Sequence, residues 1–148
     1  MRAVLSLPPR IKVLEAAGAV AGGRVKIISE KEAEVRASEG ERIYRVFKDS
    51  KSGVVSSDDN GTIYRNYVGY PIVAFMMITG ELPYDSEIGE ALKDVKWRSL
   101  NEQYRSYRIV ESIIKEKLRG RGISERRVDE FIKNVLEKLS GYSFRKLA

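Results

Sequence analysis

The segment from Pro71 to Ile78 limits the possible folds more than any other part of this chain, because its residues are apolar on every side. A helix without a polar face is stable in water only when other elements surround it. Pro71 stands in what would be the first turn and Gly80 follows the last one, which are the positions that these residues favour. The β-branched residues suit a strand as well, but the proline and the glycine favour a helix. We therefore predict a central buried helix.

Three short segments before it, residues 24–29, 32–37 and 42–48, alternate between apolar and polar side chains. Alternation with a period of two is typical of strands that bury one face and expose the other. Because short polar or glycine-containing turns separate the segments, we expect an antiparallel meander, to which residues 54–56 add a short fourth strand.

The run Asp58-Asp59-Asn60-Gly61 has the composition of a tight turn. Asn-Gly tolerates positive φ, and aspartate side chains bind nearby backbone N–H groups. The run predicts a hairpin turn, with a further strand at residues 62–67.

Helices are expected on both sides of this β-rich region. Pro8-Pro9 precede a first helix over residues 10–20, and Gly22-Gly23 end it. Apolar residues at three- and four-residue spacing predict three more helices that pack together near the C-terminus. These are residues 86–94 with Ser86 as the cap, residues 98–118, and a last helix that begins after the cap Ser124 and reaches Leu139.

The fold class that follows is α+β in a single domain over residues 1–148. Its parts are an N-terminal helix, a three- to four-stranded antiparallel meander, a central buried helix and a C-terminal helical bundle. A chain of 148 residues has the usual size of one domain. Within it we expect residues 1–7 to be flexible, 24–67 to be β-rich, 68–140 to be helical and 141–148 to form a tail.

The sequence contains neither cysteine nor histidine. Disulfides, thiolate nucleophiles, imidazole acid–base chemistry and Cys or His metal ligands are therefore excluded. Paired carboxylates occur, but nothing in the sequence raises the pKa of one and lowers that of its neighbour, as general acid–base catalysis requires. We expect no catalytic activity, no cofactor and no bound metal. The alternative is an enzyme that uses Asp, Tyr, Lys or Ser, which would require a cleft that holds Asp58 or Asp59 against a Lys or Arg.

The composition is rich in Lys, Arg and Glu and contains one glutamine, a bias that resembles proteins of hot environments. The apolar run from Tyr70 to Ile78 is far shorter than a membrane span, and two prolines interrupt the apolar start of the chain. We expect a cytoplasmic protein with no membrane partner.

The net charge of +6 is distributed unevenly along the chain. Residues 1–94 hold 13 Lys and Arg against 14 Asp and Glu, whereas residues 95–148 hold 14 against 7. On a helix over residues 98–118, five of these cations would fall within about a third of the circumference, away from the apolar sector. Cations grouped on one face gain affinity for phosphate backbones by releasing counterions.

We therefore predict a small basic protein that binds DNA or RNA through a cationic helical face. The alternative for this face is an ordinary solvated surface, partly neutralised by Glu102, Glu111 and Glu116. The residues predicted to contact phosphates are Arg98, Arg105, Arg108, Lys115, Arg119, Arg121, Arg126 and Arg127.

A cluster of aromatic residues before the central helix gives an alternative function. Tyr64, Arg65, Tyr67 and Tyr70 could rim a groove for a protein partner or for a second copy of the chain. The protein would then be an interaction or scaffold subunit without catalytic activity. Semi-buried tyrosines with a solvated hydroxyl are the other interpretation of this cluster.

Val55-Ser56-Ser57 follow the strand around Arg45, and residues 58–68 separate them from Gly69-Tyr70-Pro71, which opens the apolar helix. This order resembles the scaffold of a SWIM-type zinc finger, with the two triplets in the places of Cys-x-Cys and Cys-x-His. The resemblance covers about a third of the chain. It implies a module that binds DNA or proteins. The module would be metal-free, because no zinc-binding group stands at the four ligand positions, Val55, Ser57, Gly69 and Pro71.

Overall fold

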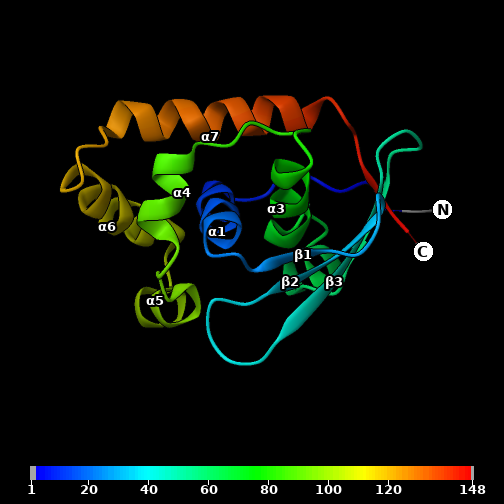
Figure 1. The fold of residues 1–148 in the computed structure, drawn as a ribbon, viewed down its shortest axis with the longest axis horizontal. Coiled ribbons are helices and arrows are strands. Elements are labelled where there is room, and N and C mark those ends of the chain that lie inside the picture. Colours follow the sequence, from blue (N-terminus) through cyan, green and yellow to red (C-terminus); the bar gives the residue numbers. More distant parts are fainter. Residues whose placement is uncertain (1–2, 148) are drawn as a thin grey trace.

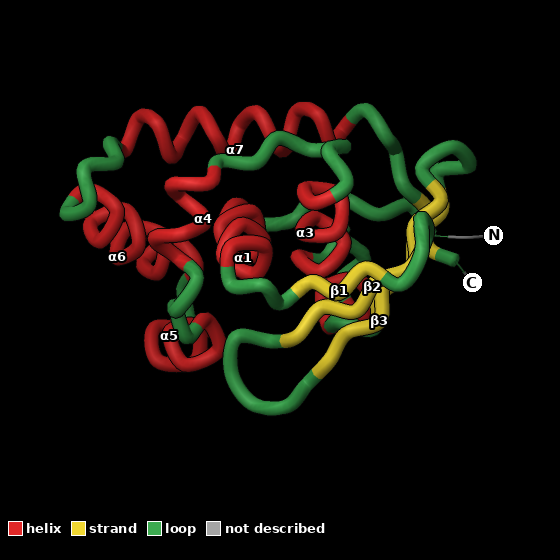
Figure 2. The backbone as a smooth tube through the Cα atoms, in the orientation of Figure 1, coloured by secondary structure: helices red, strands yellow, loops and turns green. Residues whose placement is uncertain are grey.

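The computed structural model of the protein describes residues 3–147. Within them the chain forms seven helices and one five-stranded mixed sheet, which confirms the predicted α+β class. Most of the helices gather at one end of the molecule and the strands at the other (Figures 1 and 2). None of the helices in the described part combines the length and the apolarity that a membrane crossing requires.

The helices are α1 (Arg10–Ala21), α2 (Asn60–Tyr64), α3 (Tyr70–Ile78), α4 (Ser86–Leu92), α5 (Trp97–Tyr104), α6 (Tyr107–Arg119) and α7 (Glu125–Ser140). The strands are β1 (Val25–Ile27), β2 (Glu32–Arg36), β3 (Ile43–Asp49), β4 (Val54–Ser57) and β5 (Arg145–Lys146).

The strands lie in the order β1-β2-β3-β4-β5. The first four form the predicted antiparallel meander. Ala33 lies opposite Val46 and both are buried, whereas the next pair, Glu34 and Arg45, points to the other side of the sheet. β5 belongs to the segment expected to be a tail. It pairs with β4 in the parallel direction and completes the sheet.

The segment before α1, expected to be flexible, is paired with the rest of the fold over residues 3–7. The N–H of Leu5 donates to the carbonyl of Phe144 at 2.9 Å, and the N–H of Ser6 donates to the carbonyl of Asn66 at 2.8 Å. The Leu5 side chain is buried. The segment therefore lies between the backbone near Phe144 and the backbone near Asn66, and it is hydrogen-bonded to both.

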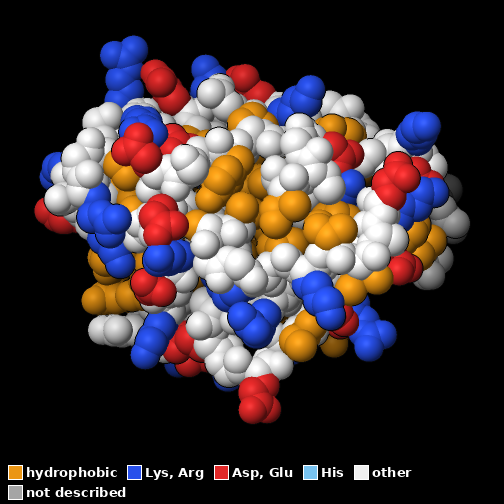
Figure 3. All heavy atoms as spheres, viewed as in Figure 1, with side chains coloured by type: hydrophobic (Ala, Val, Ile, Leu, Met, Phe, Trp, Pro, Cys, Tyr) orange, Lys and Arg blue, Asp and Glu red, His pale blue; other side chains and the backbone are white. Residues whose placement is uncertain are grey.

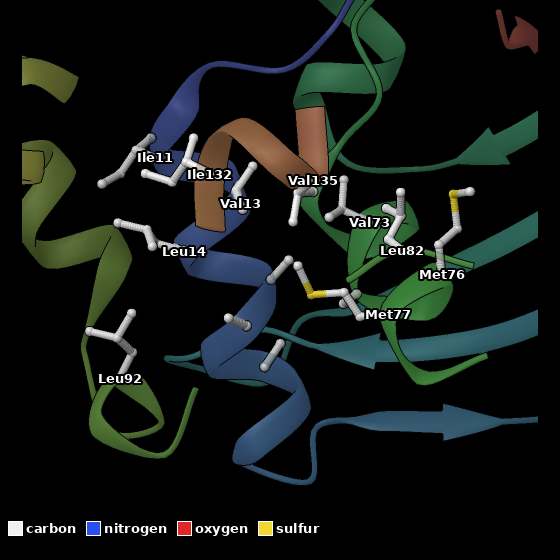
Figure 4. Close-up of a cluster of buried hydrophobic side chains, with 14 of the residues drawn as sticks. Ile11, Val13, Leu14, Val73, Met76, Met77, Leu82, Leu92, Ile132 and Val135 are labelled. Atoms are coloured by element: carbon white, nitrogen blue, oxygen red, sulfur yellow. The ribbon is translucent and has the colours of Figure 1, made fainter. Parts of the chain in front are cut away.

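α3 is the central buried helix that the sequence predicts, since its side chains from Pro71 to Met77 are all buried. It packs between α1 and the strands. α1 is also buried over most of its length, so two apolar helices form the middle of the core. Figure 4 shows Val13 of α1, Val73 of α3 and Val135 of α7 within one cluster of buried side chains.

α1 and α4 approach each other closely at two glycines. A Cβ atom at Gly18 would lie 2.8 Å from the carbonyl oxygen of Leu92, and one at Gly89 would lie 2.9 Å from that of Ala17. Both obstacles are backbone atoms, which cannot move aside as the end of a flexible side chain can. The contact fixes α4 against α1.

The predicted hairpin turn and the strand at residues 62–67 are wrong, because this part of the chain forms α2. Asp59 is the N-cap of the helix, and its carboxylate accepts hydrogen bonds from Thr62 N at 3.1 Å and Thr62 Oγ1 at 2.9 Å. Aspartate favours both turns and N-caps, because in each its side chain binds backbone N–H groups. Thr62 Oγ1 in turn accepts from Gly69 N, which joins α2 to the start of α3.

The long helix predicted over residues 98–118 is also wrong. The chain leaves the helical path at Arg105, whose φ of 50° is left-handed. Ser106 then caps α6, with its hydroxyl accepting from Ile109 N at 3.3 Å. Figure 1 shows α5 and α6 running in different directions. A left-handed residue that is not glycine is uncommon, and such residues concentrate at functional sites.

The predicted cap of α4 is wrong by one residue, because Asp85 rather than Ser86 is the N-cap of this helix.

Candidate functional site

A cleft of about 710 Å³ lies beside the break between α5 and α6. Ligand pockets in proteins usually measure about 300–1,000 Å³. Four parts of the chain that are distant in sequence line it: α1, the segment from the β2–β3 loop into β3, the segment from α2 to the start of α3, and residues 97–107. The fold brings these segments together around the N-terminal half of α1.

α5 forms one wall of the cleft, and the β2–β3 loop holds it there. Ser99 donates to the carboxylate of Glu39 through its backbone N–H at 2.8 Å and through its hydroxyl at 2.6 Å. The N–H of Trp97 donates to Ser38 Oγ at 3.3 Å. The hydrogen bonds from Ser99 lower the pKa of Glu39. Figure 1 shows α5 beside this loop.

Positively charged side chains from both walls face the cleft. Arg98 and Arg105 come from the α5 side, and Arg42 and Arg65 come from the opposite side. Of these four, only Arg98 has a carboxylate of the described residues within ion-pair distance, Glu102 at 3.1 Å. With Lys12, the cleft has five cations against the three carboxylates of Glu15, Glu39 and Glu102. An anionic ligand is therefore favoured over a cationic one.

The floor of the cleft is a buried polar chain from α1 to α5. Lys12 Nζ donates to Glu15 Oε2 at 3.0 Å, and Asn101 Nδ2 donates to Glu15 Oε1 at 2.9 Å. Glu15 is only 3% exposed. Burial opposes the charge of Lys12, but the adjacent carboxylate raises the pKa of this lysine above its ordinary value. Lys12 also lies over the ring of Tyr107, 5.1 Å from its centroid.

Tyrosines supply the aromatic part of the cleft. Tyr44, Tyr70 and Tyr107 line it, and Arg42 lies 5.0 Å from the centroid of the Tyr44 ring. Burial raises the pKa of Tyr44 and of Tyr70. These two phenols are therefore neutral at physiological pH. They can exchange hydrogen bonds with a ligand but do not supply a tyrosinate base or nucleophile, and their rings contact each other edge to face.

Two polar atoms of α5 are buried without a hydrogen-bond partner among residues 3–147. They are Nε1 of Trp97 and Oδ1 of Asn101, and both residues line the cleft. The guanidinium of Arg24 has two further unpaired nitrogens, although its third donates to the carbonyl of Arg36 at 2.9 Å. Unpaired buried polar groups are rare in proteins, and each is costly.

The chain matches the model of a protein family described as "Uncharacterised conserved protein UCP014422" over residues 5–145. It belongs to this family. No curated protein and no solved structure matches it. The matched residues include all seven helices and every residue that lines the cleft, so the site lies within the part of the chain that the UCP014422 family shares.

In this UCP014422 protein the cations predicted to contact phosphates do not form one helical stripe. Arg98 and Arg105 line the cleft, whereas the other six lie on α6, on α7 or in the loop between them. Five of the eight are paired with carboxylates: Arg98, Lys115, Arg119, Arg126 and Arg127. Figure 3 shows Lys and Arg intermixed with Asp and Glu across the face of the molecule in view.

Lys115 is the clearest case of a cation with a structural role. It donates to Asp129 at 2.7 Å and lies 3.0 Å from Glu111. Arg10 of α1 contacts the same two carboxylates, so the group joins α1, α6 and α7. Although burial acts against it, hydrogen bonds to Asp129 and Glu111 raise the pKa of Lys115.

The four residues predicted as a partner surface are separated in the structure. Arg65 and Tyr70 line the cleft. Tyr64 projects into solvent with 77% of its surface exposed, and Tyr67 is 9% exposed. Tyr67 lies under Gly61, where a Cβ would overlap with its ring.

Other features of the described residues are weaker candidates for a site. A hollow of about 380 Å³ lies between α4 and the α6–α7 loop. Its acidic residues Glu87 and Glu90 are already paired with Arg127 and Lys93. Residues 3–147 contain no cluster of three acidic side chains arranged to hold a metal ion.

The sequence pattern identified three of the five cleft cations, Arg98 and Arg105 as phosphate contacts and Arg65 as part of a partner surface. It missed Lys12, Arg42, Trp97 and Asn101. One signal was present, because Trp97, Asn101 and Arg105 are four residues apart and therefore share one face of a helix. Lys12 and Arg42 gave no such signal. They belong to a distant helix and a loop that only the tertiary fold brings to α5.

Proposed function

We propose that this protein binds single-stranded nucleic acid in the cleft. The observation that carries the proposal is the row of arginines on opposite walls, of which Arg42, Arg65 and Arg105 have no carboxylate partner within residues 3–147. Cations of this kind gain affinity for phosphates by releasing counterions from the nucleic acid. The protein would act by binding, without catalysis.

The tyrosines favour an unpaired strand over a duplex. Tyr44, Tyr70 and Tyr107 line the cleft together with the arginines, and the rings of Tyr44 and Tyr70 are partly buried. Bases stacked within a duplex cannot reach recessed rings, whereas an unpaired base can lie against them. Stacking of bases on aromatic side chains combined with a cationic groove is the usual way in which proteins bind single strands.

Fluorescence anisotropy with labelled oligonucleotides tests the proposal. Single-stranded DNA, single-stranded RNA and duplex DNA of equal length are titrated with protein from about 50 to 300 mM salt. Four phosphate contacts predict a logarithmic salt slope of about −3 for a single strand. We expect the single strands to bind more tightly than the duplex.

Two double variants with equal change of charge locate the binding. Arg42→Ala/Arg65→Ala removes two cations from the cleft, and Arg126→Ala/Lys133→Ala removes two exposed cations from α7. The cleft variant should weaken binding at least tenfold and flatten the logarithmic salt slope by about 1.4. The α7 variant should change the affinity less than twofold. Equal losses in the two variants, or no binding of any oligonucleotide at about 50 mM salt, would contradict the proposal.

Protein interaction is the second candidate function, and the exposure of Tyr64 favours it. Large aromatic side chains in solvent are frequent anchors of protein interfaces, and the neighbouring Ile63 is also exposed. Light scattering of the wild type and of Tyr64→Ala separates the two functions. A stable assembly that moderate salt leaves intact and that the variant loses would support this alternative.

A further inference from the structure

The wall of the cleft formed by α5 has a defined chemical pattern. Trp97 and Asn101 are four residues apart, so they lie one turn apart on the same face of the helix, and Arg105 follows after a second turn. All three line the cleft. This wall of the cleft therefore contains an indole, an amide and a guanidinium.

The orientation of the Asn101 amide follows from its neighbours. Its Nδ2 donates to Glu15 Oε1 at 2.9 Å, and Glu15 is held in turn by Lys12. This contact turns the other end of the amide, the acceptor Oδ1, away from Glu15. Oδ1 is buried and accepts no hydrogen bond from any residue between 3 and 147.

The indole of Trp97 supplies the complementary donor. Trp97 is only 4% exposed, and its Nε1–H has no acceptor in the described part of the chain. One unpaired donor and one unpaired acceptor thus belong to residues that are one helical turn apart and that line a cleft bordered by arginines. A ligand that satisfies both must carry an acceptor and a donor close together.

We propose that Trp97 and Asn101 recognise the hydrogen-bonding edge of a nucleobase, an inference that rests on the proposed function. The Watson–Crick edge of every base carries a donor and an acceptor on neighbouring positions, whereas phosphate oxygens are acceptors only. The indole N–H donates to a carbonyl or ring nitrogen of the base, and Asn101 Oδ1 accepts from its N–H or amino group. Arg98 and Arg105, on the same helix, hold the adjacent phosphates.

The base reaches these atoms by a small displacement of α5. Trp97 is the one residue of this helix that is buried, and the helix ends at the left-handed Arg105. Its connection to the β2–β3 loop consists of the hydrogen bonds from Trp97 N and from Ser99. A helix with so little buried surface can shift without unfolding the core.

The test separates hydrogen bonding from stacking by using base mimics. Oligonucleotides of thymine or adenine are compared with oligonucleotides of the same length that carry difluorotoluene or 4-methylbenzimidazole, which keep the shape of these bases but lose donors and acceptors. For the more tightly bound of the two natural bases, wild-type protein should prefer the natural base over its mimic by about tenfold, as expected for a good pair of base contacts.

Substitutions at the two residues complete the test. Trp97→Phe keeps an aromatic ring but removes the donor, and Asn101→Ala removes the acceptor. Each should reduce the preference for the natural base to about twofold or less while the salt slope stays unchanged. Gln103→Ala, on the exposed side of α5, is the matched control and should keep the preference. Thermal unfolding of each variant shows whether it is folded. If Trp97→Phe does not fold, Asn101→Ala alone tests the base preference, because this substitution opens no large cavity.

Two other results have distinct meanings. If wild-type protein binds natural base and mimic equally, with binding that still depends on Arg42 and Arg65, base recognition is overturned and the proposed function stands. If no oligonucleotide binds at about 50 mM salt, both are overturned.

Discussion

Asn101 of α5 donates a 2.9 Å hydrogen bond to the carboxylate of Glu15, which lies in the middle of α1. Eighty-six residues separate the two in sequence. This contact joins the α5 wall of the cleft to α1, a largely buried helix of the core, through a carboxylate that also holds Lys12. The stability of the fold and the shape of the site are therefore coupled at Glu15.

Glu15→Gln should lower the free energy of unfolding by about 2 kcal/mol, because it leaves the buried ammonium of Lys12 without its counter-charge. Urea unfolding measures the change. The control is Glu137→Gln, whose pair with Lys133 is exposed on α7 and should contribute less than about 0.5 kcal/mol. Similar losses in both variants would show that Lys12 does not depend on Glu15.

Stability should be nearly constant from about pH 5 to pH 9, because the chain has no histidine to titrate in that range. At higher pH it should fall. Burial raises the pKa of Tyr67 to about 12 and also raises that of Tyr70, and Glu15 raises that of Lys12 against the effect of burial. A group whose folded pKa is raised loses its proton first in the unfolded state, so stability is lost as the pH rises from about 10 through the folded pKa values.

At low pH the carboxylates make stability fall as the pH falls. Despite burial, hydrogen bonds from Arg10 and Lys115 lower the pKa of Glu111, and hydrogen bonds from Lys48 and others lower that of Glu81. A lowered folded pKa gives stability that is present above the unfolded value, near 4.3, and is lost as the pH falls below it. Urea midpoints measured from pH 3 to pH 11 test both limbs, and a maximum confined to a narrow range around neutrality would contradict the account.

Much of the architecture can be predicted from the sequence, because α1, α3 and the first four strands have clear local patterns. The apolar run after Pro71 can only be a buried element, and the alternation around Val35 and Val46 can only be a half-buried sheet. β5 could not be predicted in this way, since two residues, Arg145 and Lys146, form a strand only because β4 lies beside them.

The break at Arg105 shows the limit of local patterns. Neither glycine nor proline marks it, and the apolar spacing continues from Leu100 through Val110 as if one helix ran through. The one local signal is Ser106, which suits an N-cap. The cleft depends on this break and on the β2–β3 loop that meets α5, so its residues could not be grouped by sequence periodicity.

The contact between α1 and α4 gives a prediction about packing. Gly18→Ala should lower the free energy of unfolding by about 2 kcal/mol, although alanine favours a helix by about 1 kcal/mol over glycine. The reason is that the new methyl group meets the carbonyl oxygen of Leu92 at 2.8 Å. Gly120→Ala at the end of α6 is the control, because its Cβ would lie 3.4 Å from the nearest atom. Urea unfolding should find the control neutral, and a neutral Gly18→Ala would refute the close approach.

Trp97 is the only tryptophan of the chain and lies in the cleft, so its fluorescence reports directly on the site. We predict that titration with a single-stranded oligonucleotide at about 50 mM salt changes the Trp97 emission in a saturable way. The change should be lost in Arg42→Ala/Arg65→Ala and kept in Arg126→Ala/Lys133→Ala. Binding that anisotropy detects while the Trp97 emission stays constant would place the nucleic acid elsewhere and contradict the account.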